Sequence, residues 1–433
     1  KIIFASENFK KYYMPNKITK FICLIFALSI CFHLNAQNVS LSMNSGYQNQ
    51  IFYSMQNGET LNTSNQNWDI AFSTASMSST IRTNDGKGVE LYTYQDGDTS
   101  AWNNINNNDI NNLPELMFNS DTSWQYGAFD INQIGGFDYG WGIYNIQTHH
   151  LVGDSVFLIK TINGNWKKLW IKSKILGEYT ISYADLDGNN IVNTNISASN
   201  YTNKNFIYYS LDSDLIVDRE PNKDDWDITF TKYLTPYPFQ GGFTPYSVTG
   251  VLQNEGVSIA QADNITSPLT YNNYNQHTFS NRINTIGFDW KVFQASYTIL
   301  NDLCYFVRDK SNNVWRLTFT NFEGTSTGNI EFNTELLTNT STSIEDVDGI
   351  NTLKIYPNPT LIGHEITVVY ELKSNQKALV MLHDITGREV YSSKLSNNGL
   401  KLHKIATQNL GKGVYMLSIN LDGILKSERI MIN

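Results

Sequence analysis

Histidine is the side chain best suited to bind iron in this sequence, and residues 40–338 contain three: His149, His150 and His277. Imidazole nitrogens are common ligands of iron. His149 and His150 are adjacent, and neighbours on a strand point to opposite faces, so they do not easily serve one site together. His277, in a polar loop, is then the partner available to either of them. The competing interpretation is that all three are surface residues or satisfy turns.

No arrangement typical of an enzyme occurs in the chain. We find no paired carboxylates, no nucleophile with a base and no cluster of His and Asp at metal-binding spacing. Residues 185–189 (DLDGN) suggest a calcium loop, but the third ligand and the closing Glu of an EF-hand are absent. We interpret them as a tight turn. We therefore expect no catalytic residues and no enzymatic activity.

Composition narrows the class of protein. The chain has 433 residues, more than one hydrophobic core usually organises, so we expect two or three domains. The fraction of hydrophobic residues, 41%, is sufficient for folded cores. The net charge is −9, and no stretch concentrates Lys or Arg between aromatic residues. Nucleic acid is therefore not an expected partner, because phosphate binding needs clustered cations.

The beginning of the chain predicts export. From Met14 a positive segment with Lys17 and Lys20 precedes an apolar run over residues 21–32, and small Ala36 offers a cleavage site. This run is too short to span the ~30 Å hydrocarbon core of a bilayer. We therefore expect residues 1–36 to comprise upstream residues and a signal peptide. No later segment is apolar enough to be transmembrane.

Cysteine usage excludes a disulfide framework. Cys31 follows the bulky Ile30 inside the expected signal peptide, which argues against a lipid anchor, since that signal requires a small residue there. After signal removal only Cys304 remains, so no internal disulfide can form. Its apolar neighbours predict a buried, unreactive thiol.

The middle of the chain contains an internal repeat. Residues 67–72 (NWDIAF) recur as residues 225–230 (DWDITF), and residues 136–139 (GFDY) recur as residues 287–290 (GFDW), in the same order. We expect the Trp residues to anchor cores, and Asp69 and Asp227 to bind local backbone. The repeat predicts two modules, which we place at residues 40–215 and 216–338.

The sequence pattern of both modules predicts β-strands. Residues 156–173 and 304–321 each alternate apolar and polar side chains around a polar turn, as β-hairpins do. Residues 237–252 resemble a Gly-rich turn leading into a strand. No segment longer than one or two turns has helical periodicity. We therefore predict an all-β, or mainly β, fold with two β-rich modules.

The end of the chain forms a separate small domain. A polar linker at residues 339–352 precedes short strands over residues 353–433. Residues 356–359 (YPNP), 384–390 (DITGREV) and 413–415 (GVY) match, in order, motifs of the type A C-terminal sorting domain of type IX secretion, which this segment resembles. The resemblance implies recognition by the type IX machinery and delivery to the surface, or release, of a Gram-negative bacterium. It also implies removal of the tail.

The middle region resembles another family. The WDI-x-F segments, the GFDW block and residues 304–319 are similar to the HmuY haem-binding family. The resemblance implies a β-rich fold and haem held by paired side chains, commonly His. None of the three histidines lies inside a matching motif, so the family's iron ligands cannot be assigned residue by residue.

Three functions remain open from the sequence. The first is capture of haem or porphyrin by His277 with His149 or His150, because haem needs an apolar slot and one or two axial donors. The second is a structural or adhesive surface protein that keeps this fold without a ligand, which the scarcity of His favours. The third is carbohydrate binding on exposed aromatic side chains, if these line one open groove.

Overall fold

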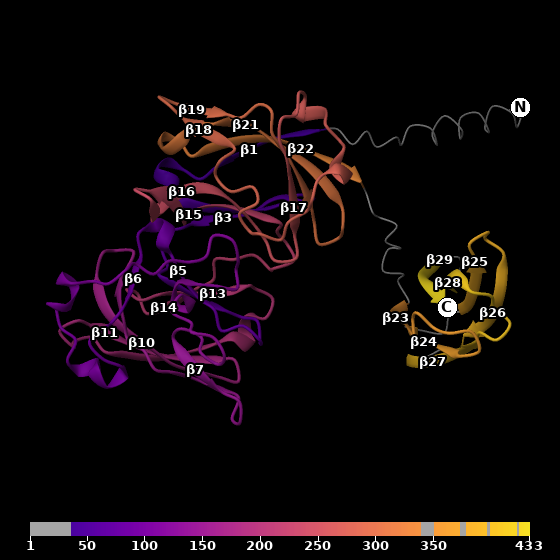
Figure 1. Cartoon of the computed structure of the whole chain (residues 1–433), viewed down its shortest axis with the longest axis horizontal. Coiled ribbons are helices and arrows are strands. Elements are labelled where there is room, and N and C mark those ends of the chain that lie inside the picture. The colour runs from indigo at the N-terminus through magenta and orange to yellow at the C-terminus, as the bar shows by residue number, and fades with distance from the viewer. Residues whose placement is uncertain (1–35, 339–349, 373–377, 396–398, 422–423) are drawn as a thin grey trace, which may run out of the picture. The chain divides into compact units, whose positions relative to one another are not determined.

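The computed structural model describes residues 36–338, 350–372, 378–395, 399–421 and 424–433. The chain forms two compact units that divide between Thr338 and Asn339, and each is described by itself (Figure 1). The signal peptide expected at residues 1–36 lies outside the described residues except for Ala36, as does the linker expected at residues 339–352 except for its last three positions.

The prediction of an all-β fold is confirmed. The named strands pair in antiparallel fashion, and the only helical elements among the described residues are short 3-10 turns. These turns are η1 (Ser45–Tyr47), η2 (Asp85–Lys87), η3 (Thr99–Asn103), η4 (Asp109–Asn111), η5 (Ala128–Asp130), η6 (Ala198–Tyr201), η7 (Pro268–Thr270), η8 (Tyr274–Gln276) and η9 (Gly324–Ser326).

The first half of the large unit is a sandwich of two sheets. Alternate side chains of facing strands, such as Phe72 and Ile171, enter one buried core. A seven-stranded sheet contains β6 (Glu90–Thr93), β7 (Gly142–Asn145), β8 (His150–Gly153), β9 (Phe157–Lys160), β10 (Trp166–Ile175), β11 (Glu178–Asp185) and β12 (Val192–Ser197). A four-stranded sheet runs in the order β14 (Leu215–Val217), β13 (Phe206–Ser210), β4 (Ile70–Ser73) and β5 (Ile81–Thr83).

The second half is also a sandwich, with a core of its own. Its five-stranded sheet runs β1 (Gln37–Ser42), β22 (Asn329–Thr338), β21 (Val314–Phe322), β20 (Cys304–Arg308) and β17 (Ser258–Ala262). Its four-stranded sheet runs β16 (Gly242–Gln253), β15 (Ile228–Phe239), β2 (Asn49–Ser54) and β3 (Gly58–Ser64). A small hairpin pairs β18 (Lys291–Phe293) with β19 (Tyr297–Ile299). The first three strands of the chain thus belong to the half that its later residues build.

With these N-terminal strands included, nine strands of each half match in order. The order β14-β13-β4-β5 corresponds to β3-β2-β15-β16, and β12-β11-β10-β9-β6 corresponds to β1-β22-β21-β20-β17. The two modules expected from the sequence were continuous segments, residues 40–215 and 216–338. The sheets instead assign residues 37–64 to the second half and β14 to the first. The beginning of the chain therefore closes the fold that its later residues leave incomplete.

The repeated aspartates join segments that are distant in the sequence. The backbone N–H of Leu211 donates to the Asp69 carboxylate at 2.7 Å, and that of Met55 donates to the Asp227 carboxylate at 2.7 Å. The expectation of local backbone partners is wrong, because the strand beside each WDI segment comes from elsewhere in the chain.

Expectations for the buried residues are confirmed. Trp68, Trp226, Trp290 and Trp315 are all buried. Cys304 is buried and free, and burial raises the pKa of its thiol to about 11, which leaves it unreactive near neutral pH. The hairpins expected at residues 156–173 and 304–321 are present as β9–β10 and β20–β21.

The small unit is a second type of sandwich. Asp384 closes one hairpin by accepting hydrogen bonds from the backbone N–H groups of Thr386 and Arg388, with Gly387 at φ 83°. One sheet runs β23 (Ile350–Tyr356), β24 (Glu365–Leu372) and β27 (Gly399–Ala406). The other runs β26 (Glu389–Leu395), β25 (Ala378–Asp384), β28 (Gly413–Leu421) and β29 (Ile424–Ile432).

Candidate functional site

The largest of the characterised cavities lies at one end of the first sandwich, and we name it the loop-end pocket. It has a volume of about 760 Å³. Four connections form its wall: the β4–β5 tip, the β7–β8 hairpin, the β10–β11 turn and η6. Its size falls in the range of small-molecule sites, ~300–1,000 Å³.

One histidine singled out from the sequence lines this pocket. His149 ends the turn between β7 and β8, where Asn145 accepts hydrogen bonds from the backbone N–H groups of Gln147 and Thr148 through its side chain. His149 itself has φ 58°, an uncommon left-handed conformation for a residue other than glycine. Residues held in such conformations concentrate at functional sites, and here the conformation accompanies a side chain on the pocket wall.

The His149 ring is oriented by a tyrosine. Its Nδ1 lies 2.7 Å from the hydroxyl of Tyr144, which also lines the pocket. When Nδ1–H donates to that hydroxyl oxygen, Nε2 carries the lone pair and can bind a metal. The Tyr144 hydroxyl therefore orients one imidazole on the wall of the pocket.

Two large apolar side chains lie at the rim of the pocket. Met77, at the β4–β5 tip, is 94% exposed, and Leu176, at the β10–β11 turn, is 97% exposed. Tyr139 and Leu151 continue the apolar surface inward. Large apolar side chains gathered at a cavity mouth are typical of ligand-binding sites.

Lys174 supports the pocket wall through hydrogen bonds to its backbone. It is buried, and its ammonium group donates to the backbone carbonyl oxygens of Ala75 and Ser78 at the β4–β5 tip. Burial lowers the pKa of Lys174 to about 8. Because two of its three N–H donors are engaged by backbone, Lys174 holds the β4–β5 tip in place on the pocket wall.

The other two predicted histidines lie elsewhere. His150 begins β8 and does not line the loop-end pocket. His277 belongs to the second half, where its Nε2 lies 3.0 Å from the Tyr271 hydroxyl and its ring is near Phe306. The structure thus does not bring His277 together with His149 or His150, because their neighbours belong to different sandwiches.

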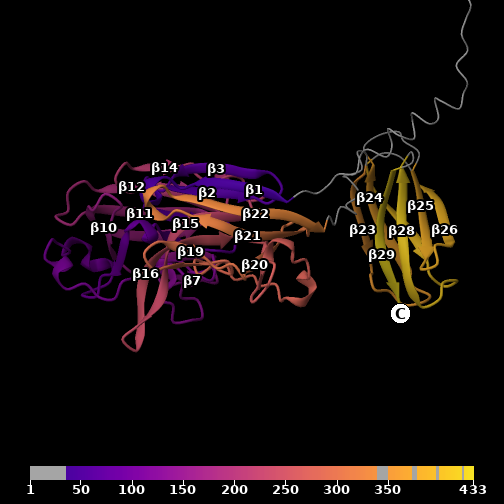
Figure 2. The same cartoon turned by 90° about the horizontal axis from the view of Figure 1, so that it is seen from above.

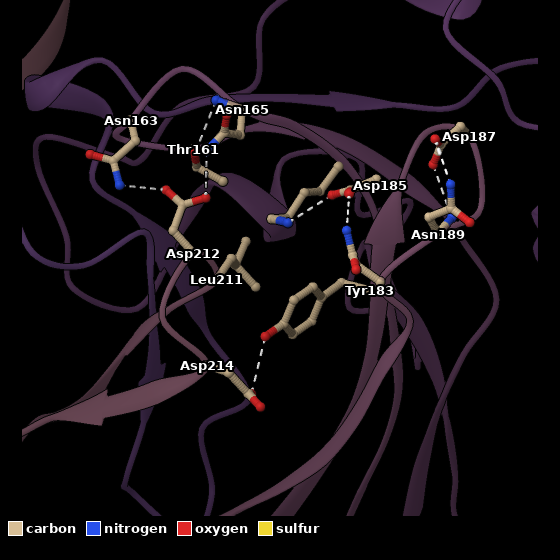
Figure 3. A network of polar contacts seen from close by, with 12 residues as sticks. Thr161, Asn163, Asn165, Tyr183, Asp185, Asp187, Asn189, Leu211, Asp212 and Asp214 are labelled. Atoms are coloured by element: carbon tan, nitrogen blue, oxygen red, sulfur yellow. Dashed lines mark hydrogen bonds and ion pairs between the residues drawn. The ribbon is translucent and has the colours of Figure 1, made fainter.

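The suggested calcium loop is a hairpin turn between β11 and β12 (Figure 3). Asp185 and Asn189 pair through their backbones at 3.0 Å, and Asn189 donates to both oxygens of the Asp187 carboxylate. Lys167 forms an ion pair with Asp185 at 2.9 Å. No group of three or more His, Cys, Asp or Glu positioned for a metal ion exists within the part of the chain that the structure describes. The interpretation as a tight turn is confirmed.

A second cavity lies between the halves and is too small for an organic ligand. Its volume is about 60 Å³, room for a few water molecules. Beside it, Arg219 donates to Gln50 and to the backbone carbonyl of Ser64, while its guanidinium lies 5.0 Å from the ring of Tyr208. Arg219 therefore ties strands of the second half to the first. We regard this region as a structural seam.

The sequence did not reveal most of the loop-end pocket. Tyr144, Met77 and Leu176 belong to three separate connections, and only their meeting in space makes them a site. One usable signal was present: His149 follows Tyr144 by five positions across a polar turn, a spacing that a short hairpin brings together.

Comparison with known families identifies the small unit. Residues 354–433 match the model of the secretion system C-terminal sorting domain. The tail is a sorting domain. The chain is therefore secreted to the outer surface or the extracellular space, as its motifs predicted. Among the described residues, no helix is long and apolar enough to cross a membrane.

The remainder of the chain has only distant likenesses. A polysaccharide lyase is 6% identical with a TM-score of 0.17, covering 85% of this chain and 40% of that one. The BSP domain of a biofilm-associated protein is 10% identical with a TM-score of 0.17, covering 59% of this chain and 60% of that one. Scores this low do not indicate a shared fold. The comparison with curated proteins gave no match.

Proposed function

We propose that this chain is a non-enzymatic binding protein of the bacterial surface, and that its ligand occupies the loop-end pocket. Export by the sorting domain places it where it can meet extracellular molecules. The supporting observation is the pairing of an open apolar pocket with one oriented imidazole, His149.

Haem or a related porphyrin is the ligand that best uses these features. A porphyrin needs an apolar slot, which Met77, Tyr139, Leu151 and Leu176 provide, and its iron needs an axial donor, which His149 Nε2 provides. The residues present fit haem held by one protein imidazole, and not by the pair that the sequence suggested. Bound haem would supply its own iron chemistry, while the protein would bind and orient it.

Titration of the secreted chain with haemin, followed by absorbance, tests this proposal. The expected result is a saturable shift of the Soret band that is strongly weakened in His149→Ala and unchanged in His277→Ala. His277→Ala is the matched control, because that imidazole lies in the other half. A flat titration, or equal binding by both variants, would refute the proposal.

A second candidate function is adhesion without a pocket ligand. The observation that favours it is the large exposed aromatic surface on the β15–β16 hairpin, where Tyr237, Phe239, Phe243 and Tyr246 are all about half exposed or more. A flat haemin titration would leave this candidate in place.

A further inference from the structure

The β15–β16 hairpin extends well beyond the sheet that contains it. β15 pairs with β16 along its whole length but with β2 only at Ile228–Phe230, so the outer part is a two-stranded ribbon. In Figure 2 this ribbon projects from the large unit as a separate arm. We name residues 234–247 the aromatic arm.

The aromatic arm is firmly held at its base. Gly86 approaches so closely that an added Cβ would lie 2.3 Å from the backbone oxygen of Lys232. On the other side, the Asp121 carboxylate accepts hydrogen bonds from Thr235, at 2.6 Å, and from Asn284, at 3.0 Å. A rigid base positions the side chains further out, as a binding surface requires.

One face of the aromatic arm carries aromatic rings and hydroxyl groups together. Residues directly opposite in antiparallel strands share a face, and here Thr235 faces Tyr246 and Tyr237 faces Thr244. The rings of Tyr237 and Tyr246 lie with centroids 5.2 Å apart, and Phe239 extends the same face toward the tip. The opposite face carries Phe243 and prolines.

The aromatic arm has no charge. Residues 233–248 contain no Asp, Glu, Lys or Arg, although the whole chain has a net charge of −9. Without cations it offers nothing to an anionic polymer or an anionic lipid surface. Tyrosine combines an apolar ring with a polar hydroxyl, which suits a ligand that has apolar faces edged by hydroxyl groups.

We propose that the face formed by Tyr237, Phe239 and Tyr246 binds a neutral polysaccharide. Sugar rings present flat C–H faces for stacking on the aromatic rings, and their hydroxyl groups meet those of Tyr and Thr. Tyr237 and Phe239 are two positions apart, which separates their side chains by about 7 Å along the strand, so a chain of sugar rings can lie across both. This inference deepens the adhesive candidate and does not depend on the loop-end pocket.

Affinity electrophoresis of the secreted chain tests this site. The gels contain soluble β-glucan, galactomannan or dextran as neutral polymers, or alginate as an anionic one. We expect at least one neutral polymer to retard the protein and alginate to leave it unaffected. The Tyr237→Ala/Tyr246→Ala variant should bind about tenfold more weakly or worse, from the loss of two aromatic contacts.

Phe243→Ala is the matched control, since it removes a similarly exposed ring from the opposite face. It should bind as the unmodified chain does. No retardation by any neutral polymer, or equal binding by the double variant, overturns the proposal. Binding of the aromatic arm to phosphatidylcholine vesicles, or self-association that requires it, would also overturn it by assigning another partner. The double variant should still bind haemin, which separates failure here from failure at the loop-end pocket.

Discussion

The side chain of Asp227 accepts a hydrogen bond from the backbone N–H of Met55, which lies 172 positions earlier in the chain, at 2.7 Å. This contact joins the repeated WDI segment of the second half to a strand from the beginning of the chain. Asp69 makes the equivalent contact in the first half, with Leu211.

These two aspartates give a stability prediction. Asp69 also accepts a hydrogen bond from the backbone N–H of Ile162 at 2.7 Å. Asp69→Ala therefore leaves two backbone N–H groups, those of Ile162 and Leu211, without their partner, whereas Asp227→Ala leaves only one, that of Met55. Each lost partner costs about 1–3 kcal/mol. Urea unfolding should therefore show a larger loss for Asp69→Ala than for Asp227→Ala. Equal or negligible losses would contradict the assigned roles.

Matched substitutions test the closure of the second half. Ile51 on β2 and Ile207 on β13 occupy equivalent positions, and both are buried in their cores. Each change to Ala should reduce the free energy of unfolding by about 2–5 kcal/mol. In Ile51→Ala, amide hydrogen exchange should rise in β15 and β22, which lie far away in the sequence. Confinement of faster exchange to residues 37–64 would show that these strands are not part of the second half.

The stability of the large unit should increase on mild acidification. Burial raises the pKa of Asp85 and Asp227 to about 6 and that of Glu220 to about 7. A raised pKa means that the folded state binds the proton more tightly, so stability is greatest below the unfolded pKa and is lost as pH rises through the folded pKa. The urea midpoint should therefore be higher at about pH 5 than at about pH 7.

Glu220→Gln should flatten this pH dependence, because the amide resembles the protonated acid. Glu115→Gln is the control, since Glu115 is exposed. If the urea midpoint of Glu220→Gln changes with pH as much as that of the unmodified chain, the Glu220 carboxyl does not contribute to the pH dependence of stability.

The sorting domain gives a prediction about export. Removal of residues 353–433 should retain the protein inside the outer membrane, while the large unit still folds, because that unit is compact by itself. Fractionation of the native host with an antibody against the large unit measures this. Appearance of the truncated chain in the medium at the normal level would show that export does not use the tail.

Local patterns predicted local structure well. The alternation around Asn163 and Gly164 predicted the β9–β10 hairpin, with Gly164 at φ 84°, and the Gly-rich turn near Gly241 was found between β15 and β16. The placement of β1–β3 in the second half could not be predicted, because their partners lie far away and no nearby residue marks them. The loop-end pocket was missed for the same reason, since four connections that lie far apart in the sequence build it.

The surroundings of His149 could not be predicted from the sequence. The sequence suggested His277 as its partner. In the fold these two residues lie in different sandwiches, and His149 forms a hydrogen bond with Tyr144. Residue type indicated the chemistry, but only the strand pairing determined which side chains share a site.

The most direct test of the proposed function is the electron paramagnetic resonance spectrum of the secreted chain loaded with haemin. One imidazole from His149, with no second strong ligand, should leave ferric iron in the high-spin state, and this signal should be lost in His149→Ala. A low-spin spectrum typical of two imidazoles, or a high-spin complex that persists in His149→Ala, would contradict the proposal.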